Sequence, residues 1–304
     1  MKYQITMKRY TKLLLLTGLF TCLSSVFLNA QEEAEPVWPI WETLTHVDNQ
    51  TTFTPMKGSM NLEIQHRFSD IKEIADIFGI YGSANTRIGL TYGITDKIMV
   101  GLGTTRSYKQ QDLNWKWNFL QQMSSGMPVS LAYYGNAVLD ARADKFFSDP
   151  DDPDSYQFIY RLSFLHQVIA SRKFGEKIGV QVAPTFVYYN AVPEGYRNDN
   201  YSIDVGAKFQ VLGFHSIILE YDQPLAQPQD FTNDNDELIE GKTIYPNLAL
   251  GVEIGTSTHS FRVFVSNYNS IVKNRSVAFN DRNPFDFENG LENFQFGFNI
   301  SIRF

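Results

Sequence analysis

The last eleven residues of the chain, 294–304, alternate apolar side chains with polar or small ones. Successive side chains of a β-strand point to opposite faces, so one face of this segment would be wholly apolar. That face would carry Phe294, Phe296, Phe298, Ile300, Ile302 and Phe304. A soluble sheet rarely ends on such an aromatic run without a following turn. The pattern is typical of a strand that faces lipid on one side and water on the other, as in a transmembrane β-barrel.

The amino-terminal segment indicates export. Four cations precede an apolar run at 13–28, and small residues follow it at 29–31. We therefore predict a secretory signal at residues 1–30 that is removed from the mature protein. A membrane-anchoring helix is the alternative, but the run is shorter than the roughly 20 residues that a span needs. Lipid attachment at Cys22 is a third interpretation, which Thr21 before the cysteine fits poorly.

Composition excludes several classes of protein. The chain has 26 Lys and Arg against 33 Asp and Glu, a net charge of −7 that becomes more negative without the signal. This charge argues against a nucleic-acid partner. Cys22 is the single cysteine, so the mature chain would have no disulfide and no thiolate metal site. After residue 30 no apolar run is long enough for a transmembrane helix, which leaves the closed barrel as the way to span a membrane.

Twelve segments with strand-like alternation follow residue 58, most of them near the 9–11 residues that a tilted transmembrane strand needs. Their even number is usual for single-chain bacterial barrels. The segments are 59–69, 84–94, 97–107, 112–122, 128–140, 156–173, 177–190, 200–212, 214–223, 243–255, 258–269 and 291–304.

The connections alternate in length along the chain. Those after even-numbered segments are tight, and those after odd-numbered segments are mostly longer and polar. Periplasmic turns and extracellular loops produce this alternation in an up-and-down barrel. We therefore predict an all-β, transmembrane antiparallel barrel at 59–304 in the cell outer membrane, with both termini in the periplasm and a periplasmic leader at 31–58.

One parity of each segment is apolar, and the other carries charges. The outward set would include Leu62, Ile88, Leu102, Trp117, Leu131, Phe164, Val182, Phe209, Leu219, Val252 and Val263. The lumen-facing candidates are Glu63, Arg67, Arg87, Lys116, Arg161, Asp204, Lys208, Glu220, Asp222, Glu253, Arg262 and Arg303. So many charges would be costly in a dry soluble core, whereas a barrel lumen lets them meet water or one another.

Two kinds of lumen fit these residues. In a hydrated conduit, Arg67, Arg87, Lys116 and Arg161 would face Asp204, Glu220, Asp222 and Glu253 and guide polar solutes. In the other, paired side chains would plug the barrel, since twelve strands lie between the 8 that side chains fill and the 16 that leave a wide channel.

The segments outside the predicted strands have two features. The leader contains Trp38 and Trp41 and could thread into the lumen, hang in the periplasm or contact another protein; we favour a flexible leader whose tryptophans pack under the barrel rim. Residues 71–78 have the spacing of a short amphipathic helix that would cover the external mouth.

Signals for catalysis and metal binding are weak. The five histidines are scattered without the spacing of a zinc site. His66 and His166 fall on the outward parity without an evident serine, so we expect hydrogen bonds at the membrane surface there and no catalytic triad. Gly101 and Gly103 lie within a strand and would give space in the lumen. The acidic stretches 149–154 and 234–237 could hold divalent cations, but solvated loop tips are the simpler interpretation. We predict no cofactor and no metal.

Several short motifs together resemble a known family. They are His66-Arg67-Phe68, Tyr92-Gly93-Ile94-Thr95-Asp96, Ser171-Arg172-Lys173-Phe174, Pro184-Thr185-Phe186 with Asn190, Glu220-Tyr221, His259-Ser260-Phe261 with Ser266-Asn267, and Gly297-Phe298-Asn299-Ile300. The chain from about Trp38 to Phe304 resembles the β-barrel family of Bacteroidota catalogued as domain of unknown function 5777. It departs from the family at 256–258, in a turn. The resemblance implies the fold and the location but no substrate.

The carboxy-terminal strand also resembles the signal that barrel-insertion machinery reads in bacterial outer-membrane proteins. The residues concerned are Phe296, Phe298, Ile300, Ile302 and Phe304. The other expected partners are outer-membrane lipid and lipopolysaccharide, with a periplasmic protein as a partner for residues 31–57. As a function we expect a passive pore for small polar or charged solutes. The alternatives are a closed barrel that anchors or scaffolds partner proteins and, third, an outer-membrane hydrolase.

Overall fold

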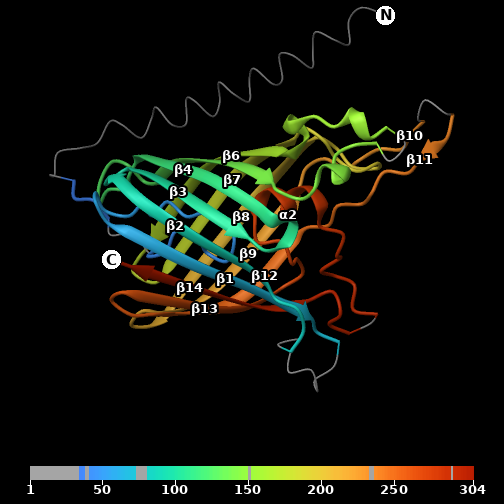
Figure 1. Cartoon of the computed structure of the whole chain (residues 1–304). Coiled ribbons are helices and arrows are strands. Elements are labelled where there is room, and N and C mark those ends of the chain that lie inside the picture. The colour runs from blue at the N-terminus through green and yellow to red at the C-terminus, as the bar shows by residue number, and fades with distance from the viewer. Residues whose placement is uncertain (1–33, 38–40, 73–80, 150–151, 233–235, 289) are drawn as a thin grey trace, which may run out of the picture.

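In a computed structural model of the chain, twelve antiparallel strands form one closed barrel (Figure 1). The structure describes residues 34–37, 41–72, 81–149, 152–232, 236–288 and 290–304. Each strand pairs with its neighbours in sequence, and β1 closes the barrel against β14. The barrel strands are β1 (Met60–Asp70), β2 (Asn85–Thr95), β3 (Ile98–Thr105), β4 (Gln110–Leu120), β5 (Ser130–Asp140), β6 (Leu162–Phe174), β7 (Ile178–Tyr189), β8 (Asp199–Leu212), β9 (His215–Pro224), β12 (Asn247–Gly255), β13 (His259–Ser266) and β14 (Gln295–Arg303).

The twelve predicted strands are confirmed, with differences near the loops. The sixth strand begins at Leu162, later than predicted, because the 3-10 turn Phe158–Arg161 precedes it. A small hairpin of β10 (Phe231–Thr232) and β11 (Leu238–Ile239) lies outside the barrel sheet. The predicted helix at 71–78 falls mostly outside the described residues. A helix that we did not predict, α2 (Lys273–Phe279), occurs in the last long loop.

The two faces of the sheet follow the predicted alternation. Large apolar side chains such as Leu102, Trp117 and Leu250 lie exposed on the outer surface. Aromatic rings also stack along it, for example Phe68 on Phe296 and Phe261 on Phe298. The outer surface therefore has the apolar character that contact with lipid requires, and most charged side chains of the strands lie on the inner face.

The barrel has two unlike ends, which we call the short-turn rim and the long-loop rim. The short-turn rim carries the tight connections, such as Gly213-Phe214 between β8 and β9, and also the carboxy-terminus. The long-loop rim carries the connections 141–161, 225–246 and 267–294. The predicted alternation of loop lengths holds at most connections but not around β4, where the connection 106–109 at the long-loop rim is shorter than the connection 121–129 at the short-turn rim. That the short-turn rim faces the periplasm stays a prediction.

The lumen is filled by the chain itself. Residues 41–54, which we call the lumen hairpin, enter from the short-turn rim and turn back inside the barrel. Thr45 pairs with Gln50, the His46 N–H donates to the Asn49 carbonyl at 2.8 Å, and the Thr51 N–H donates to the Leu44 carbonyl at 2.9 Å. Residues 43–52 lie almost entirely inside, so this part of the leader differs from the flexible segment that we favoured. Buried Trp41 marks the point of entry, and Trp38 lies outside the described residues.

Helix α2 closes the barrel from the other rim. It lies within the barrel ribbon near the long loops (Figure 1), and most of its residues are buried. Its Val277 and Ala278 pack against inward side chains of β6 and β7. Among the described residues, no helix has the length and apolar character to cross a membrane.

Candidate functional site: the filled lumen

The tip of the lumen hairpin holds a buried carboxylate with its backbone. The N–H groups of Val47, Asp48 and Asn49 all donate to the carboxylate of Glu220 on β9, at 2.5–3.1 Å. Consecutive backbone N–H groups that converge in a turn form a concave site for an anion. Glu220 is fully buried, so these donors compensate part of its desolvation.

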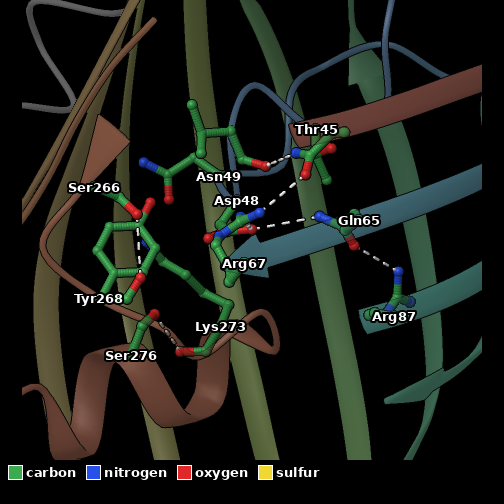
Figure 2. A network of polar contacts seen from close by, with 12 residues as sticks. Thr45, Asp48, Asn49, Gln65, Arg67, Arg87, Ser266, Tyr268, Lys273 and Ser276 are labelled. Carbon is green, nitrogen blue, oxygen red and sulfur yellow. Dashed lines mark hydrogen bonds and ion pairs between the residues drawn. The ribbon is translucent and has the colours of Figure 1, made fainter. Parts of the chain in front are cut away.

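Side chains of the tip bind two further strands. The Asp48 carboxylate lies 2.5 Å from the Arg67 guanidinium on β1 and accepts a weaker hydrogen bond from Gln65 at 3.3 Å. The Asn49 amide donates to Asp222 on β9 at 2.6 Å. Figure 2 shows Asp48 between Arg67 and Gln65. The tip therefore bridges β1 and β9, which are four strands apart around the barrel.

A second polar cluster holds the arm of the hairpin before the tip. Arg262 on β13 donates to the carbonyl and hydroxyl of Thr45 and to the Glu63 carboxylate at 3.1 Å. Glu63 also accepts from the Thr45 hydroxyl at 2.8 Å and from the Ser301 hydroxyl at 3.0 Å. Both charges are buried and paired, which is the arrangement that keeps a buried ion tolerable.

The base of the hairpin makes hydrogen bonds in which at most one partner is charged. The Lys116 ammonium donates to the Phe53 carbonyl at 3.0 Å, and the Asn118 amide donates to the Thr52 carbonyl at 2.9 Å. The hydroxyls of Thr52 and Ser171 lie 2.7 Å apart. Arg303 donates to the Glu42 carbonyl at 3.2 Å at the short-turn rim. Both arms of the hairpin therefore leave the lumen at the same rim.

Helix α2 brings one cation to an acidic group of the wall. The Lys273 ammonium binds Asp222 and lies 3.5 Å from Asp204. Asp204 also accepts from Ser202 and Thr185, at 2.6 and 2.8 Å. Two carboxylates of β8 and β9 therefore share this ammonium, and Glu220 lies two residues before Asp222 on the same face of β9.

The opposite side of the lumen is apolar. A buried cluster there joins the hairpin and α2 to the inner faces of β3, β5, β6 and β7. Its members are Leu44, Met99, Ala132, Tyr134, Leu165, Ile169, Ala183, Val187, Tyr189, Val277 and Ala278. The lumen thus has an apolar half and a largely charged half, and the charged half also holds a smaller apolar cluster of Val47, Ile218, Ala249, Phe264 and Tyr268.

The structure gives each predicted lumen residue a position. Nine are buried inside the barrel: Glu63, Arg67, Lys116, Asp204, Lys208, Glu220, Asp222, Glu253 and Arg262. Arg87 is slightly exposed and binds Asp112 through two hydrogen bonds of 2.9 and 2.7 Å. A Cβ at Gly103 would lie 2.3 Å from that pair, so this glycine does provide lumen space.

Two of the candidates lie outside the lumen centre. Arg161 belongs to the 3-10 turn at the long-loop rim, where it binds Tyr156 and Asp144. Arg303 lies at the short-turn rim. The expected pattern of cations facing acids across open space is also wrong, because Lys208 pairs with Glu253 at 2.5 Å and the hairpin separates Arg67 from Glu220.

Four residues of the site were missed. Asp48, Asn49 and Lys273 lie in the predicted leader and in a predicted loop, and Asp112 is not among the predicted lumen residues. The Asp48-Asn49 pair is a turn signal, and its position between the apolar residues Val47 and Phe53 could have indicated a hairpin.

The histidines have structural contacts. His66 and His166 hydrogen-bond to Thr86 and Tyr133 on the outer surface, at 2.9 and 2.6 Å. His46, in the hairpin and outside the strands, lies 3.6 Å from Glu220. Burial, with the charges of Lys208 and Arg262, lowers the pKa of His46 to about 3. The contact between His46 and Glu220 is therefore not an ion pair at neutral pH.

Metal binding receives no support from the described residues, in which no three His, Cys, Asp or Glu side chains gather as a metal site would require. Parts of both acidic stretches, 150–151 and 233–235, lie outside the described residues.

The cavities at the two rims are larger than the one at the hairpin tip. The cavity at the tip has about 30 Å³ and touches Asp48, Gln65, Arg87 and Lys273. One of about 620 Å³ opens at the short-turn rim beside Trp41. One of about 380 Å³ opens at the long-loop rim beside Arg106 and Arg282. Another of about 480 Å³ opens at the long-loop rim beside Arg142 and Arg161.

Comparison with protein families identifies the barrel. Residues 41–304 match the family described as "Membrane bound beta barrel domain (DUF5777)". The chain belongs to this family. The match begins at Trp41, so it includes the lumen hairpin as well as the strands. The chain is therefore a membrane-bound barrel, in agreement with the predicted location in the outer membrane, while a source in the Bacteroidota stays a prediction.

Solved structures with the same general shape are distant. The NanC porin has 8% identity and a TM-score of 0.45, with 81% of this chain and 98% of that chain covered. The COG4313 outer membrane channel from Pseudomonas putida F1 has 10% identity and a TM-score of 0.43, with 83% and 97% covered. Outer membrane phospholipase A from Escherichia coli has 13% identity and a TM-score of 0.37, with 83% and 94% covered. Among curated proteins, none matches this sequence at a significant level.

Proposed function

We propose that this protein is an outer-membrane conduit for small polar or charged solutes that its own lumen hairpin holds closed at rest. The observation that carries the proposal is the path of the hairpin. Both arms leave the lumen at the short-turn rim, next to Arg303 and Asn118. A segment that enters and leaves at one rim can withdraw without breaking any strand pair or unthreading the chain.

The wall behind the hairpin supports this role. The polar contacts at its tip are hydrogen bonds and ion pairs to Arg67, Glu220 and Asp222, all groups that water can solvate, and Val47 is the tip's one residue in an apolar cluster. Withdrawal therefore exchanges protein contacts for water contacts and exposes a polar lining suited to charged solutes. Residues 34–37 bond to the turn near Gln122 and Ser124, which keeps the released segment at the rim.

Helix α2 forms a second closure from the long-loop rim. Its polar anchor on the charged half is Lys273 on Asp222 and Asp204. A continuous passage requires this contact to open as well as the hairpin. We therefore expect brief openings of the conduit between long closed periods.

The test is a reversible lock on the hairpin. Thr52 and Ser171 have hydroxyl oxygens 2.7 Å apart, and a Cβ–Sγ bond is longer than Cβ–Oγ, so T52C with S171C can form a disulfide. The mature chain would hold no other cysteine. In planar bilayers, the wild type should show discrete openings, the oxidised double variant should lose them, and reduction should restore them. Each single-cysteine variant is the matched control.

Two results would overturn the proposal. Openings that persist in the oxidised double variant would show that the hairpin is not the gate. Silence of the wild type, of the reduced double variant and of D48A with K273Q would show a permanently closed barrel.

The filled lumen favours a closed scaffold as the second candidate function. Most residues of the hairpin and of α2 are buried inside the barrel, and buried Leu44 and Val277 share one apolar cluster. In that case, deleting residues 31–57 should abolish co-purification of a partner while the barrel still assembles. No contact of His66 or His166 supports the hydrolase interpretation, since their hydrogen-bond partners are Thr86 and Tyr133.

A further inference from the structure

The hairpin tip occupies its site in the manner of a small ligand. One residue, Asp48, uses both of its polar ends: its N–H donates to both oxygens of Glu220 at 3.1 Å, and its carboxylate lies 2.5 Å from Arg67. Figure 2 shows how its side chain meets Arg67. We propose that Asp48 stands in for a soluble zwitterion, and that the wall beneath the hairpin is a binding site for small amino acids.

Arg67 keeps its position independently of the hairpin. Its guanidinium also donates to the Asn299 side chain at 3.0 Å and to the His66 carbonyl at 2.9 Å. It lies over the ring of Phe264, 4.4 Å from the centroid. An arginine fixed by a ring and by backbone is a preorganised receptor for a carboxylate. When Asp48 leaves, this guanidinium has no other carboxylate within 4.0 Å among the described residues.

The Glu220 carboxylate is the group that would bind the ammonium of the ligand. Besides the hairpin, it accepts only a long hydrogen bond from the Tyr268 hydroxyl, at 3.3 Å, among the described contacts. Its neighbours Asp204 and Asp222 share the single ammonium of Lys273. Three carboxylates against one ammonium leave an excess of negative charge. A ligand ammonium supplies a full positive charge there, which the neutral backbone N–H of Asp48 cannot.

The distance between the Arg67 guanidinium and the Glu220 carboxylate determines which length of ligand can bind both. In Asp48 two carbon atoms separate the nitrogen from the carboxylate carbon, as they do in β-alanine. Free aspartate contains the same unit. Larger solutes would need more space than the volume of the hairpin tip and the adjacent cavity of about 30 Å³ together provide. The site therefore fits small amino acids in preference to sugars or peptides.

This inference rests on the proposed function, because the site is free only while the hairpin is withdrawn. A soluble ligand must compete with a tethered segment whose effective concentration is in the millimolar range, so probes at about 10 mM are appropriate. Because the ligand binds only the withdrawn state, it must shift the population towards that state.

The experiment follows the exposure of the tip in the full chain. Val47 is wholly buried beside Asp48, so in V47C a membrane-impermeant maleimide reacts only when the hairpin withdraws. β-Alanine at about 10 mM should raise the labelling rate about threefold or more. Propionate and propylammonium, each with one of the two charges, should have little effect at equal ionic strength. V47C with E220Q should lose the response to β-alanine, and V47C with E176Q, changed on an exposed turn, should keep it.

The outcomes separate the two proposals. Labelling that occurs but is unchanged by β-alanine, or is raised equally by propionate, would overturn the amino-acid site and leave the gate intact. A complete lack of labelling with every probe would overturn the gate and the site together.

Discussion

The charged and apolar halves of the lumen are filled by the same two segments in different ways. On β5, β6 and β7, the hairpin and α2 contribute Leu44, Val277 and Ala278 to a close-packed cluster. On β1, β9 and β13, the hairpin contributes mainly amides, hydroxyls and a carboxylate, with Val47 as its one residue in the smaller apolar cluster there. Apolar packing is favourable because water is excluded, whereas polar contacts exchange with water at little net cost. The apolar half therefore contributes most of the packing that stabilises the closed state, and the charged half contributes most of the contacts that water can replace.

The largest effect is expected from R262Q in the charged half. Arg262 binds Glu63 and the Thr45 carbonyl, so its loss leaves a buried carboxylate unpaired, at a cost of about 3–5 kcal/mol in unfolding free energy. Urea unfolding in lipid vesicles measures this change. We also expect faster labelling of V47C. R161Q, at the long-loop rim, is the control; equal losses for both variants would contradict the role of the buried pair.

L165A is the corresponding change in the apolar half. Leu165 is fully buried, so truncation should lower the unfolding free energy by about 2–5 kcal/mol. Since no polar contact of the tip is touched, the response of V47C labelling to β-alanine should be unchanged. A loss of that response on L165A would remove the distinction between the halves.

G297A tests whether Arg67 is held in place by its ring. A Cβ at Gly297 would lie 2.2 Å from the Phe264 ring, so the ring must move, at a cost of about 1–3 kcal/mol. The β-alanine response should weaken. G135A is the control. Its Cβ would lie 2.3 Å from Trp115, so it crowds a ring to a similar degree, but this ring does not contact Arg67. An equal weakening in both variants would point to a general effect of crowding.

The smallest effect is expected from T52A. This change removes one hydrogen bond, to Ser171, worth about 0.5–1.5 kcal/mol. Open time in planar bilayers should rise severalfold or less, and S171A should behave alike. A double variant that adds nothing to either single change would show that the two hydroxyls act as a pair.

The barrel could be predicted from sequence because its signals are local. The two-residue alternation of β14 and the alternation of loop lengths depend only on neighbouring residues. Sequence left an open and a filled lumen as alternatives, because the contacts that fill the lumen pair residues far apart in sequence. Asp48 and Lys273 lie in segments without periodicity, and their partners Arg67 and Asp222 looked the same whether they faced water or protein.

The seam between β1 and β14 constrains how the molecule is assembled. The Met60 N–H donates to the Phe304 carbonyl at 2.7 Å, and Leu62 faces Ile302 in register. These contacts join the two ends of the barrel chain, so this strand pair closes a longer stretch of chain than any other pair of the barrel and is the slowest to form by chance encounter. A slip of one residue in β14 would turn Asn299 and Ser301 towards lipid. The hairpin would then lose the Asn299 side chain that donates to the Val47 carbonyl, so its seating discriminates a correctly closed barrel from a misregistered one.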